Sequence, residues 1–142
     1  MDKAVVIDAS VWVSRLLPHD LHHNASRLWV EQYKSKGGLF IAPSLLVIEV
    51  AASVSRQTGA AALAKEAARN LYTIHGIRIV PLKAHLVWTA SQVAADLRLR
   101  TGDATYVAVA DQLSIPLISW DKEQRQKAAE RVPTYTPDSY VF

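Results

Sequence analysis

The chain has 142 residues, of which half are hydrophobic and a fifth are charged, with a formal net charge of +3. This length suits a single domain over residues 1–142, and the composition excludes an intrinsically disordered chain. Cysteine is absent, which excludes a disulfide framework, a thiolate nucleophile and a cysteine zinc site. No basic leader or membrane-length apolar run is visible, so we expect a cytoplasmic protein outside the membrane.

Short β-branched and apolar runs alternate with helical patterns along the whole chain. The first run, AVVI, has no polar alternation, which is typical of a strand buried on both faces of a parallel sheet. Proline, glycine and serine mark most of the boundaries, and we expect Ser10 and Thr101 to cap the helices that follow them. The expected elements are strand 4–7, helix 11–17, helix 24–35, strand 39–42, helix 44–56, helix 60–73, strand 77–81, helix 86–97, helix 103–113, strand 116–119, a charged helix from 123 and an edge strand within 133–142.

Strands that alternate with helices indicate parallel pairing through crossover connections. The sequence therefore predicts an α/β fold, a three-layer α/β/α sandwich with a central parallel sheet of four to five strands. Neither an internal repeat nor a linker long enough to divide the chain is visible.

Four acidic residues stand in apolar surroundings: Asp8, Glu49, Asp103 and Asp121. A carboxylate in such a place loses hydration worth several kcal/mol unless it is paired, protonated or bound to a metal ion. Asp8 and Asp121 follow strands, where ligands of parallel sheets gather, and Asp103 opens a helix whose dipole favours negative charge. Glu49 lies inside LLVIEVAAS, so its helix is expected to be buried all round. The simpler explanation of this acid is that it pairs with an Arg or Lys side chain or stays protonated.

A shared divalent cation would explain several such acids together. Oxygen ligands without cysteine favour a hard ion, Mg²⁺ or Mn²⁺, whereas Ca²⁺ would need more protein oxygens from a local loop. Ions of this kind support the hydrolysis of phosphodiester bonds by an activated water molecule. The basic residues Arg98, Arg100 and Lys122 flank the acids and are expected to hold substrate phosphates.

The segments VIDAS, IEVAAS, GDATYVAVA and SWDKE, in this order and spacing, resemble the PIN domain family, and within it the VapC-type toxins of toxin–antitoxin pairs. The resemblance places Asp8, Glu49, Asp103 and Asp121 on the acidic catalytic and metal-binding positions of the family, and Ser10 and Ser119 on its supporting hydroxyl positions. It implies a metal-dependent endoribonuclease, usually a homodimer, that is silenced by a VapB-type antitoxin protein. Trp120 departs from the family pattern, which more often has a small residue before the last acid.

Several other polar and aromatic residues have simpler explanations. Asp96 lies one turn before Arg100, which predicts an exposed i,i+4 pair, and Asp111 is expected to pair at the surface. The histidines at 19, 22 and 23 could bind zinc but lack an acidic or thiol partner at helical spacing. The tryptophans at 12, 29 and 88 are expected to fill packed positions, although Trp12 could also touch a nucleotide.

Three other functions are compatible with the α/β pattern. An aspartate-nucleophile phosphatase would need a second Asp two residues after Asp8, where Ser10 stands. A signalling receiver domain would need an acid after the strand IRIVP, which has none. A catalytically silent RNA- or protein-binding module is the remaining alternative, and the presence of all four acids argues against it.

Overall fold

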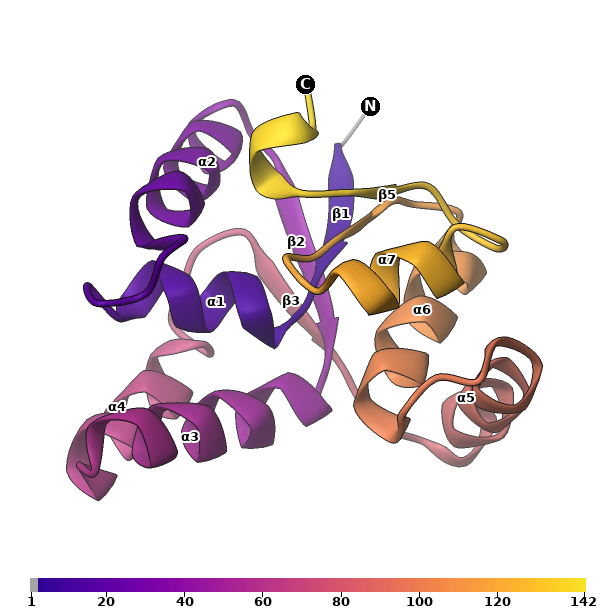
Figure 1. The fold of residues 1–142 in the computed structure, drawn as a ribbon, viewed down its shortest axis with the longest axis horizontal. Coiled ribbons are helices and arrows are strands. Elements are labelled where there is room, and N and C mark those ends of the chain that lie inside the picture. The colour runs from indigo at the N-terminus through magenta and orange to yellow at the C-terminus, as the bar shows by residue number, and fades with distance from the viewer. Residues whose placement is uncertain (1–2) are drawn as a thin grey trace.

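The computed structural model describes residues 3–142 and contains a five-stranded, all-parallel sheet in the order β3-β2-β1-β4-β5 (Figure 1). The strands are β1 (Ala4–Ile7), β2 (Leu39–Pro43), β3 (Ile77–Val80), β4 (Leu117–Ile118) and β5 (Thr134–Tyr135). The helices are α1 (Ala9–Leu16), α2 (His23–Ser35), α3 (Leu45–Thr58), α4 (Ala61–Asn70), α5 (Ala84–Leu97), α6 (Thr101–Leu113) and α7 (Lys122–Ala128), with a final 3₁₀ turn, η1 (Pro137–Ser139).

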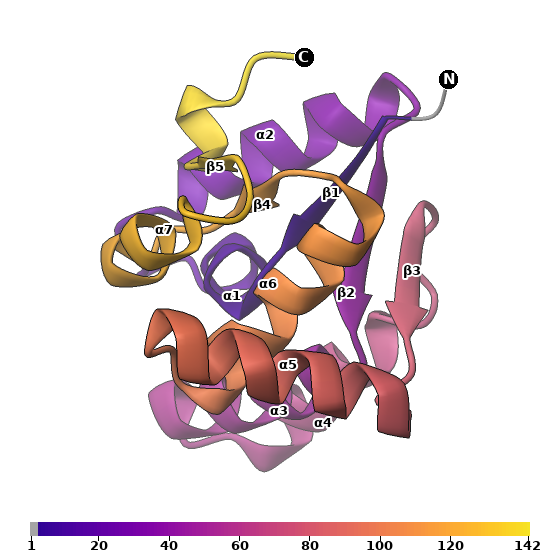
Figure 2. The same cartoon turned by 90° about the vertical axis from the view of Figure 1, so that its right-hand side faces the viewer.

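The helices cover both faces of the sheet. Helices α1 to α4 lie on one side, and α5 and α6 lie on the other (Figures 1 and 2). The predicted three-layer α/β/α class, with a parallel sheet of four to five strands, is therefore confirmed. None of the helices in residues 3–142 combines the length and apolar character needed to cross a membrane.

Strand β1 occupies the middle of the sheet because its side chains can be buried on both faces. Val5, Val6 and Ile7 have no exposed surface, and the strand pairs with β2 on one edge and β4 on the other. Burying a side chain of this size stabilises the fold by roughly 1.5–3 kcal/mol. The chain that leaves β1 therefore emerges from the core, at the carboxyl edge of the sheet.

Two predicted helix caps are wrong. Asp8, and not Ser10, caps α1, because the Asp8 carboxylate accepts the Ser10 backbone N–H. Arg100, and not Thr101, occupies the cap position of α6, because the helix already begins at Thr101. In both places an earlier residue, Asp8 or Arg100, already has the extended backbone of a cap, so the hydroxyl residue enters the first helical turn.

Two predictions of burial are also wrong. Helix α3 buries only one face, with Leu46, Val50 and Val54 inside, while Ile48 is 65% exposed. Trp88 is 66% exposed on α5, whose buried stripe is formed by other residues. Both helices are outer-layer elements, so one side contacts the protein and the opposite side faces outward whatever its composition. Trp12 and Trp29 are buried as predicted.

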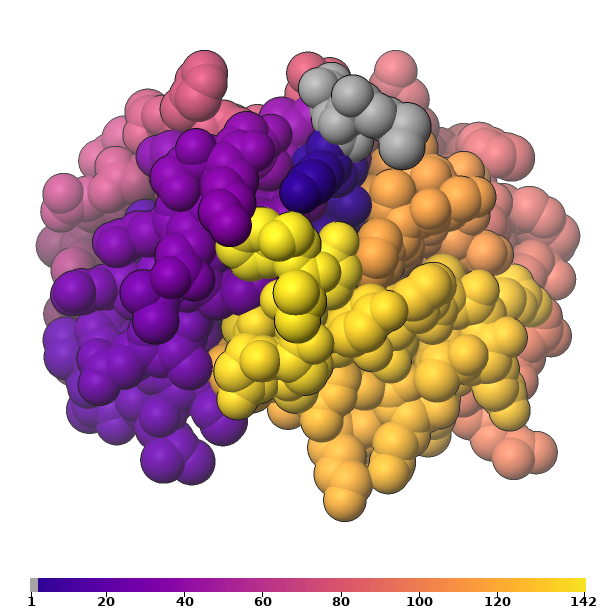
Figure 3. Space-filling view, turned by 90° about the horizontal axis from the view of Figure 1, so that it is seen from above, coloured from indigo at the N-terminus to yellow at the C-terminus, as the bar shows by residue number. Residues whose placement is uncertain are grey.

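The C-terminal segment closes the end of the molecule that lies opposite the carboxyl edge of the sheet. It contributes the predicted edge strand as β5, then turns through η1 and lies against α2 (Figure 3). Tyr140 and Phe142 pack against Trp29 and Tyr33, with the Tyr33 and Phe142 ring centroids 5.2 Å apart. This aromatic cluster stabilises the amino edge of the sheet and leaves the carboxyl edge free.

Candidate active site

The four acids come from separate segments that meet near the carboxyl edge of the sheet. Asp8 follows β1 and caps α1, and Asp121 follows β4 and caps α7. Glu49 lies in the second turn of α3, just after β2, and Asp103 lies in the first turn of α6. The fold thus brings together residues that are more than 100 positions apart in the sequence.

Asp8 is the most buried of these acids, with 5% of its surface exposed. Its carboxylate accepts hydrogen bonds from the Ser10 hydroxyl at 2.5 Å and the Ser119 hydroxyl at 2.6 Å. Burial nevertheless raises the pKa of Asp8 to about 6, and the nearby charges of Asp103 and Glu49 add to the rise. The folded protein therefore makes ionisation of Asp8 less favourable than it is in the unfolded chain, and a bound positive charge would oppose this effect.

Asp103 has the same electrostatic character although it is only half-buried. Burial and, to a smaller extent, the negative charges of Asp121 and Glu49 raise its pKa to about 6, and Arg100 opposes them. The charges of Asp103 and Glu49 raise the pKa of Asp8, and the charges of Asp121 and Glu49 raise the pKa of Asp103. The four carboxylates therefore form one electrostatically coupled cluster.

Glu49 is held by helix α6. The Tyr106 hydroxyl donates a hydrogen bond to Glu49 Oε1 at 2.5 Å. Burial and the Glu49 charge both raise the pKa of Tyr106, so the phenol stays protonated and remains a donor. The other carboxylate oxygen, Oε2, lies only 2.7 Å from the point where a side chain on Gly102 would place its Cβ. The first turn of α6 therefore approaches Glu49 so closely that a Cβ atom at position 102 would force the Glu49 carboxylate to move.

This close approach predicts the effect of Gly102→Ala. The new methyl group would force the Glu49 carboxylate to shift, while alanine favours the helix by up to about 1 kcal/mol. We expect any activity that depends on Glu49 to fall about tenfold or more with no loss of stability, because small misplacements of catalytic groups are costly. Parallel activity assays and urea denaturation would check this. A fully active variant would show that the position of Glu49 does not matter.

Ser119 links Asp8 to the loop that carries Asp121. Its fully buried hydroxyl lies 2.6 Å from Asp8 Oδ2 and 2.9 Å from Gln124 Oε1, and it accepts the Asp121 backbone N–H at 3.0 Å. A hydroxyl has one proton, so Ser119 donates either to Asp8 or to Gln124. Gln124 in turn donates its backbone N–H to Asp121 Oδ1 at 3.0 Å. The predicted supporting residues Ser10 and Ser119 therefore both contact Asp8.

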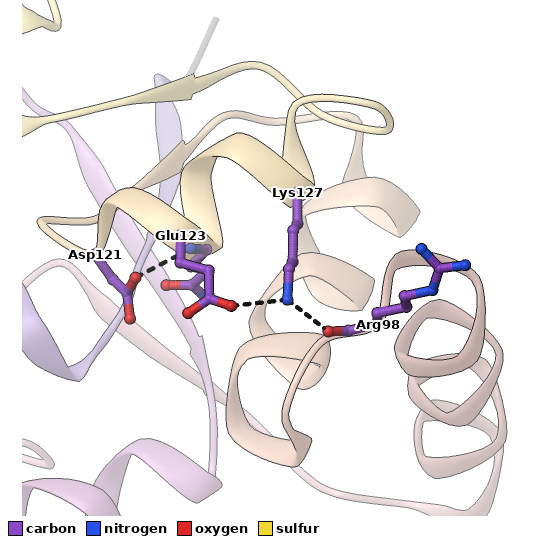
Figure 4. Close-up of polar contacts among 5 residues, drawn as sticks. Arg98, Asp121, Glu123 and Lys127 are labelled. Atoms are coloured by element: carbon purple, nitrogen blue, oxygen red, sulfur yellow. Dashed lines mark hydrogen bonds and ion pairs between the residues drawn. The ribbon is translucent and has the colours of Figure 1, made fainter.

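Basic residues line the outer side of the acid cluster. A hollow of about 130 Å³ is bordered by Arg98, Arg100, Asp103, Asp121, Glu123 and Lys127. Lys127 Nζ donates to the Arg98 carbonyl and to Glu123 Oε1, each at 2.9 Å, which ties α7 to the end of α5 (Figure 4). The Arg98 side chain points away from Asp121 (Figure 4). The positive charge of Arg100 lowers the pKa of Asp103, and Lys122 is exposed on the first turn of α7.

The donor chemistry of the cluster fits a hard divalent cation. All four acids supply carboxylate oxygens. A bound positive charge would lower the raised pKa values of Asp8 and Asp103 and so favour their ionised forms. Within residues 3–142, no three His, Asp or Glu side chains are placed closely enough to hold a metal ion as they stand. Asp8 and Glu49 instead accept hydrogen bonds from hydroxyl groups, so a cation would have to draw the carboxylates together.

Several residues of the site were not anticipated from the sequence. Tyr106, Gln124, Gly102 and Glu123 all contact or border the acids. A glycine in the first turn of an otherwise good helix, and a tyrosine three residues after Asp103, were the available signals. The predicted Asp96–Arg100 pair is wrong: Asp96 pairs with Arg131 at 2.6 Å. Asp111 also pairs with Arg131, at 3.6 Å, as a surface interaction.

A parallel α/β domain with coupled carboxylates at the carboxyl edge of its sheet defines the class of protein. The PIN domain family model matches residues 5–130, and the chain belongs to the PIN domain family. A search of curated protein sequences finds no match.

Solved structures of toxins and toxin–antitoxin complexes share the fold. Mycobacterium tuberculosis VapC20, a sarcin-ricin loop cleaving toxin, is 19% identical with a TM-score of 0.72 over 86% of this chain and 93% of that chain. Rickettsia felis VapBC2, solved with a DNA fragment from its promoter, is 10% identical with a TM-score of 0.70, covering 94% and 98%. A toxin–antitoxin complex from Klebsiella pneumoniae is 13% identical with a TM-score of 0.67, covering 97% and 99%.

Proposed function

We propose that this protein is a metal-dependent endoribonuclease and the toxin of a VapBC-type toxin–antitoxin pair. The observation that carries the proposal is the acid cluster, in which burial and the charges of neighbouring acids raise the pKa of both Asp8 and Asp103 to about 6. Perturbed acids of this kind are typical of functional sites. The family and the structural similarity to a sarcin-ricin loop cleaving toxin support the same activity.

Asp8, Glu49, Asp103 and Asp121 would hold Mg²⁺ or Mn²⁺. When bound, the ion would lower the pKa of a water molecule and neutralise charge at the phosphate. Ser10 and Ser119 orient the Asp8 carboxylate, and Tyr106 orients Glu49. Arg100 beside Asp103 is placed to bind a substrate phosphate, and Arg98 and Lys122 would contact the RNA strand farther from the acids.

The partner proteins are proposed from the structural neighbours. Several neighbours are complexes of a toxin with its antitoxin, so we propose a VapB-type antitoxin as the protein that silences this chain. A homodimer is part of the same proposal. The exposed apolar residues on α3 and α5, such as Ile48 and Val87, offer surface for such contacts.

The test is RNA cleavage by the purified chain with Mg²⁺ or Mn²⁺, with and without a chelator. Asp103→Asn is the active-site variant, and Glu66→Gln, an exposed acid on α4, is the matched control. We expect cleavage by the wild-type protein and the control only when metal is present, and none by Asp103→Asn. Tight metal binding without cleavage by any of the three proteins would instead indicate a binding module.

A further inference from the structure

A second hollow, larger than the first, opens on the other side of the acid cluster. Its volume is about 450 Å³, which lies within the roughly 300–1,000 Å³ range of ligand pockets. Ser10 and Glu49 form its inner end, so it is continuous with the candidate active site. Its outer end lies between the segment that joins α1 to α2 and the last turns of α3.

One wall of this pocket is a rigid aromatic surface. The rings of Trp120 and His22 stack with centroids 3.8 Å apart and an interplanar angle of 5°. The Trp120 indole N–H donates to Ser26 Oγ at 2.7 Å, and its backbone N–H donates to Ser10 Oγ at 3.0 Å. Trp120 is thus fixed at both its ring and its backbone. Such a surface is already organised for stacking, which contributes about 1–3 kcal/mol per nucleic-acid base.

Other residues that line the pocket supply hydrogen-bonding groups. Gln57 donates one N–H to Ser53 Oγ at 2.9 Å, which leaves its carbonyl and its second N–H for another partner. Asp20 uses one oxygen to accept the His22 backbone N–H at 2.8 Å. Among residues 3–142 no ion pair involves Arg56, which is exposed at the mouth of the pocket. Donors, acceptors and a positive charge therefore line the pocket together with the aromatic pair.

We infer, building on the proposed function, that this pocket is the subsite for one unpaired nucleotide next to the cleaved phosphodiester bond. The base would pack on the Trp120–His22 pair, Gln57 and Asp20 would read its edge, and Arg56 would contact the adjacent phosphate. Proteins recognise single-stranded RNA through this combination of stacking and edge hydrogen bonds. Trp120 is thereby a specificity-determining residue. Its large side chain, next to Asp121 in the sequence, forms one wall of the pocket for the nucleobase.

The inference is tested by the base preference of cleavage. A single-stranded RNA with randomised positions would be cut by wild type, Trp120→Ala and Trp88→Ala, and the product ends sequenced. Trp88 is the matched control because it is an exposed tryptophan on α5, remote in sequence from the pocket residues. We expect the wild type and Trp88→Ala to share a preference at one position beside the cut. Trp120→Ala should lose it, with KM raised about tenfold, equivalent to about 1.4 kcal/mol of lost stacking.

Two further variants separate recognition from misfolding. Trp120→Phe keeps an aromatic face and should retain most of the preference, while Gln57→Ala, at an exposed position, should change which base is favoured without lowering stability. Identical cleavage patterns for wild type, Trp120→Ala and Gln57→Ala would overturn the inference. Unchanged RNA cleavage together with weaker capture of a partner protein would also overturn it, because the pocket would then belong to a protein segment.

A binding measurement distinguishes failure of the subsite from failure of the proposed function. Asp8→Asn protein would be titrated with a random six-nucleotide single-stranded RNA while tryptophan fluorescence is recorded. Quenching that disappears when Trp120→Phe is added to this variant supports the subsite even if the wild-type protein cuts no RNA. Undiminished quenching in the double variant overturns the subsite even if the wild-type protein is an active ribonuclease.

Discussion

Replacing Asp8 by asparagine is expected to abolish RNA cleavage and, at the same time, to stabilise the metal-free protein above pH 6. Each pKa unit corresponds to about 1.4 kcal/mol, so a pKa raised from 3.8 to about 6 corresponds to as much as about 3 kcal/mol of lost stability. Asparagine is neutral and removes this penalty. It is also a good helix cap, so α1 keeps the interaction that Asp8 makes with the Ser10 backbone.

The hydrogen bonds around position 8 can adjust to the change. Ser119 would donate its proton to Gln124 Oε1, already 2.9 Å away, and accept from the new amide group. The buried Ser119 hydroxyl then still has both a donor and an acceptor partner. Activity should nevertheless fall by about 10³-fold, because a neutral amide cannot contribute the negative charge that holds a divalent cation.

The pH dependence of this stabilisation has a defined sign. Below about pH 4, Asp8 is protonated in both folded and unfolded wild-type protein, so wild type and variant should have similar stability. Between about pH 4 and 6 the unfolded chain loses the proton while the folded protein keeps it, and the wild type loses stability as pH rises. The gain in the variant should therefore grow through this window and stay constant above it. Urea denaturation at pH 4, 5, 6 and 8 measures it.

Asp121→Asn is the control for this prediction. Asp121 also caps a helix, through the Gln124 backbone N–H, but its side chain is exposed. The same substitution should therefore reduce activity without a comparable gain in stability. Equal or lower stability of Asp8→Asn at pH 8 would contradict the conclusion that the fold strains the Asp8 carboxylate.

The sheet and its helices were predictable because their signals are local. Four consecutive β-branched or small apolar residues before Asp8 indicate a buried strand, and Gly59 ends α3 in the left-handed conformation that glycine favours. The convergence of the acids followed from one topological rule, that the carboxyl ends of parallel strands meet at the same edge. The catalytic and metal-binding roles of these acids stay predictions.

The details that were missed depend on contacts between distant segments. The run LLVIEVAAS suggests burial all round, but only the packing of α3 in an outer layer decides that Ile48 is exposed and Glu49 faces the site. Tyr106 reaches Glu49 across 57 positions of sequence, and the crowding at Gly102 exists only because α6 crosses this carboxylate. No periodicity within one helix encodes these approaches.

Binding of Mn²⁺ is expected to compete with protons at the same carboxylates. At pH 7.5 both Asp8 and Asp103 are mainly ionised, and addition of Mn²⁺ at about 100 times its Kd should stabilise the protein by about 2.7 kcal/mol. Well below pH 6 each ion bound must displace about two protons, so the Kd should rise about 100-fold for each pH unit. Calorimetric titration in buffers with different ionisation enthalpies measures the protons released.

The number of displaced protons identifies the binding site. In Asp8→Asn only Asp103 remains with a pKa near 6, so the Kd should change about tenfold per pH unit below pH 6 instead of about 100-fold. Glu66→Gln should keep the steeper wild-type dependence, because Glu66 lies on α4. An affinity that is the same at pH 5 and pH 7.5 would show that the ion binds away from Asp8 and Asp103. The loss of one proton in Asp8→Asn would place Mn²⁺ at the carboxylates that the fold makes hardest to ionise.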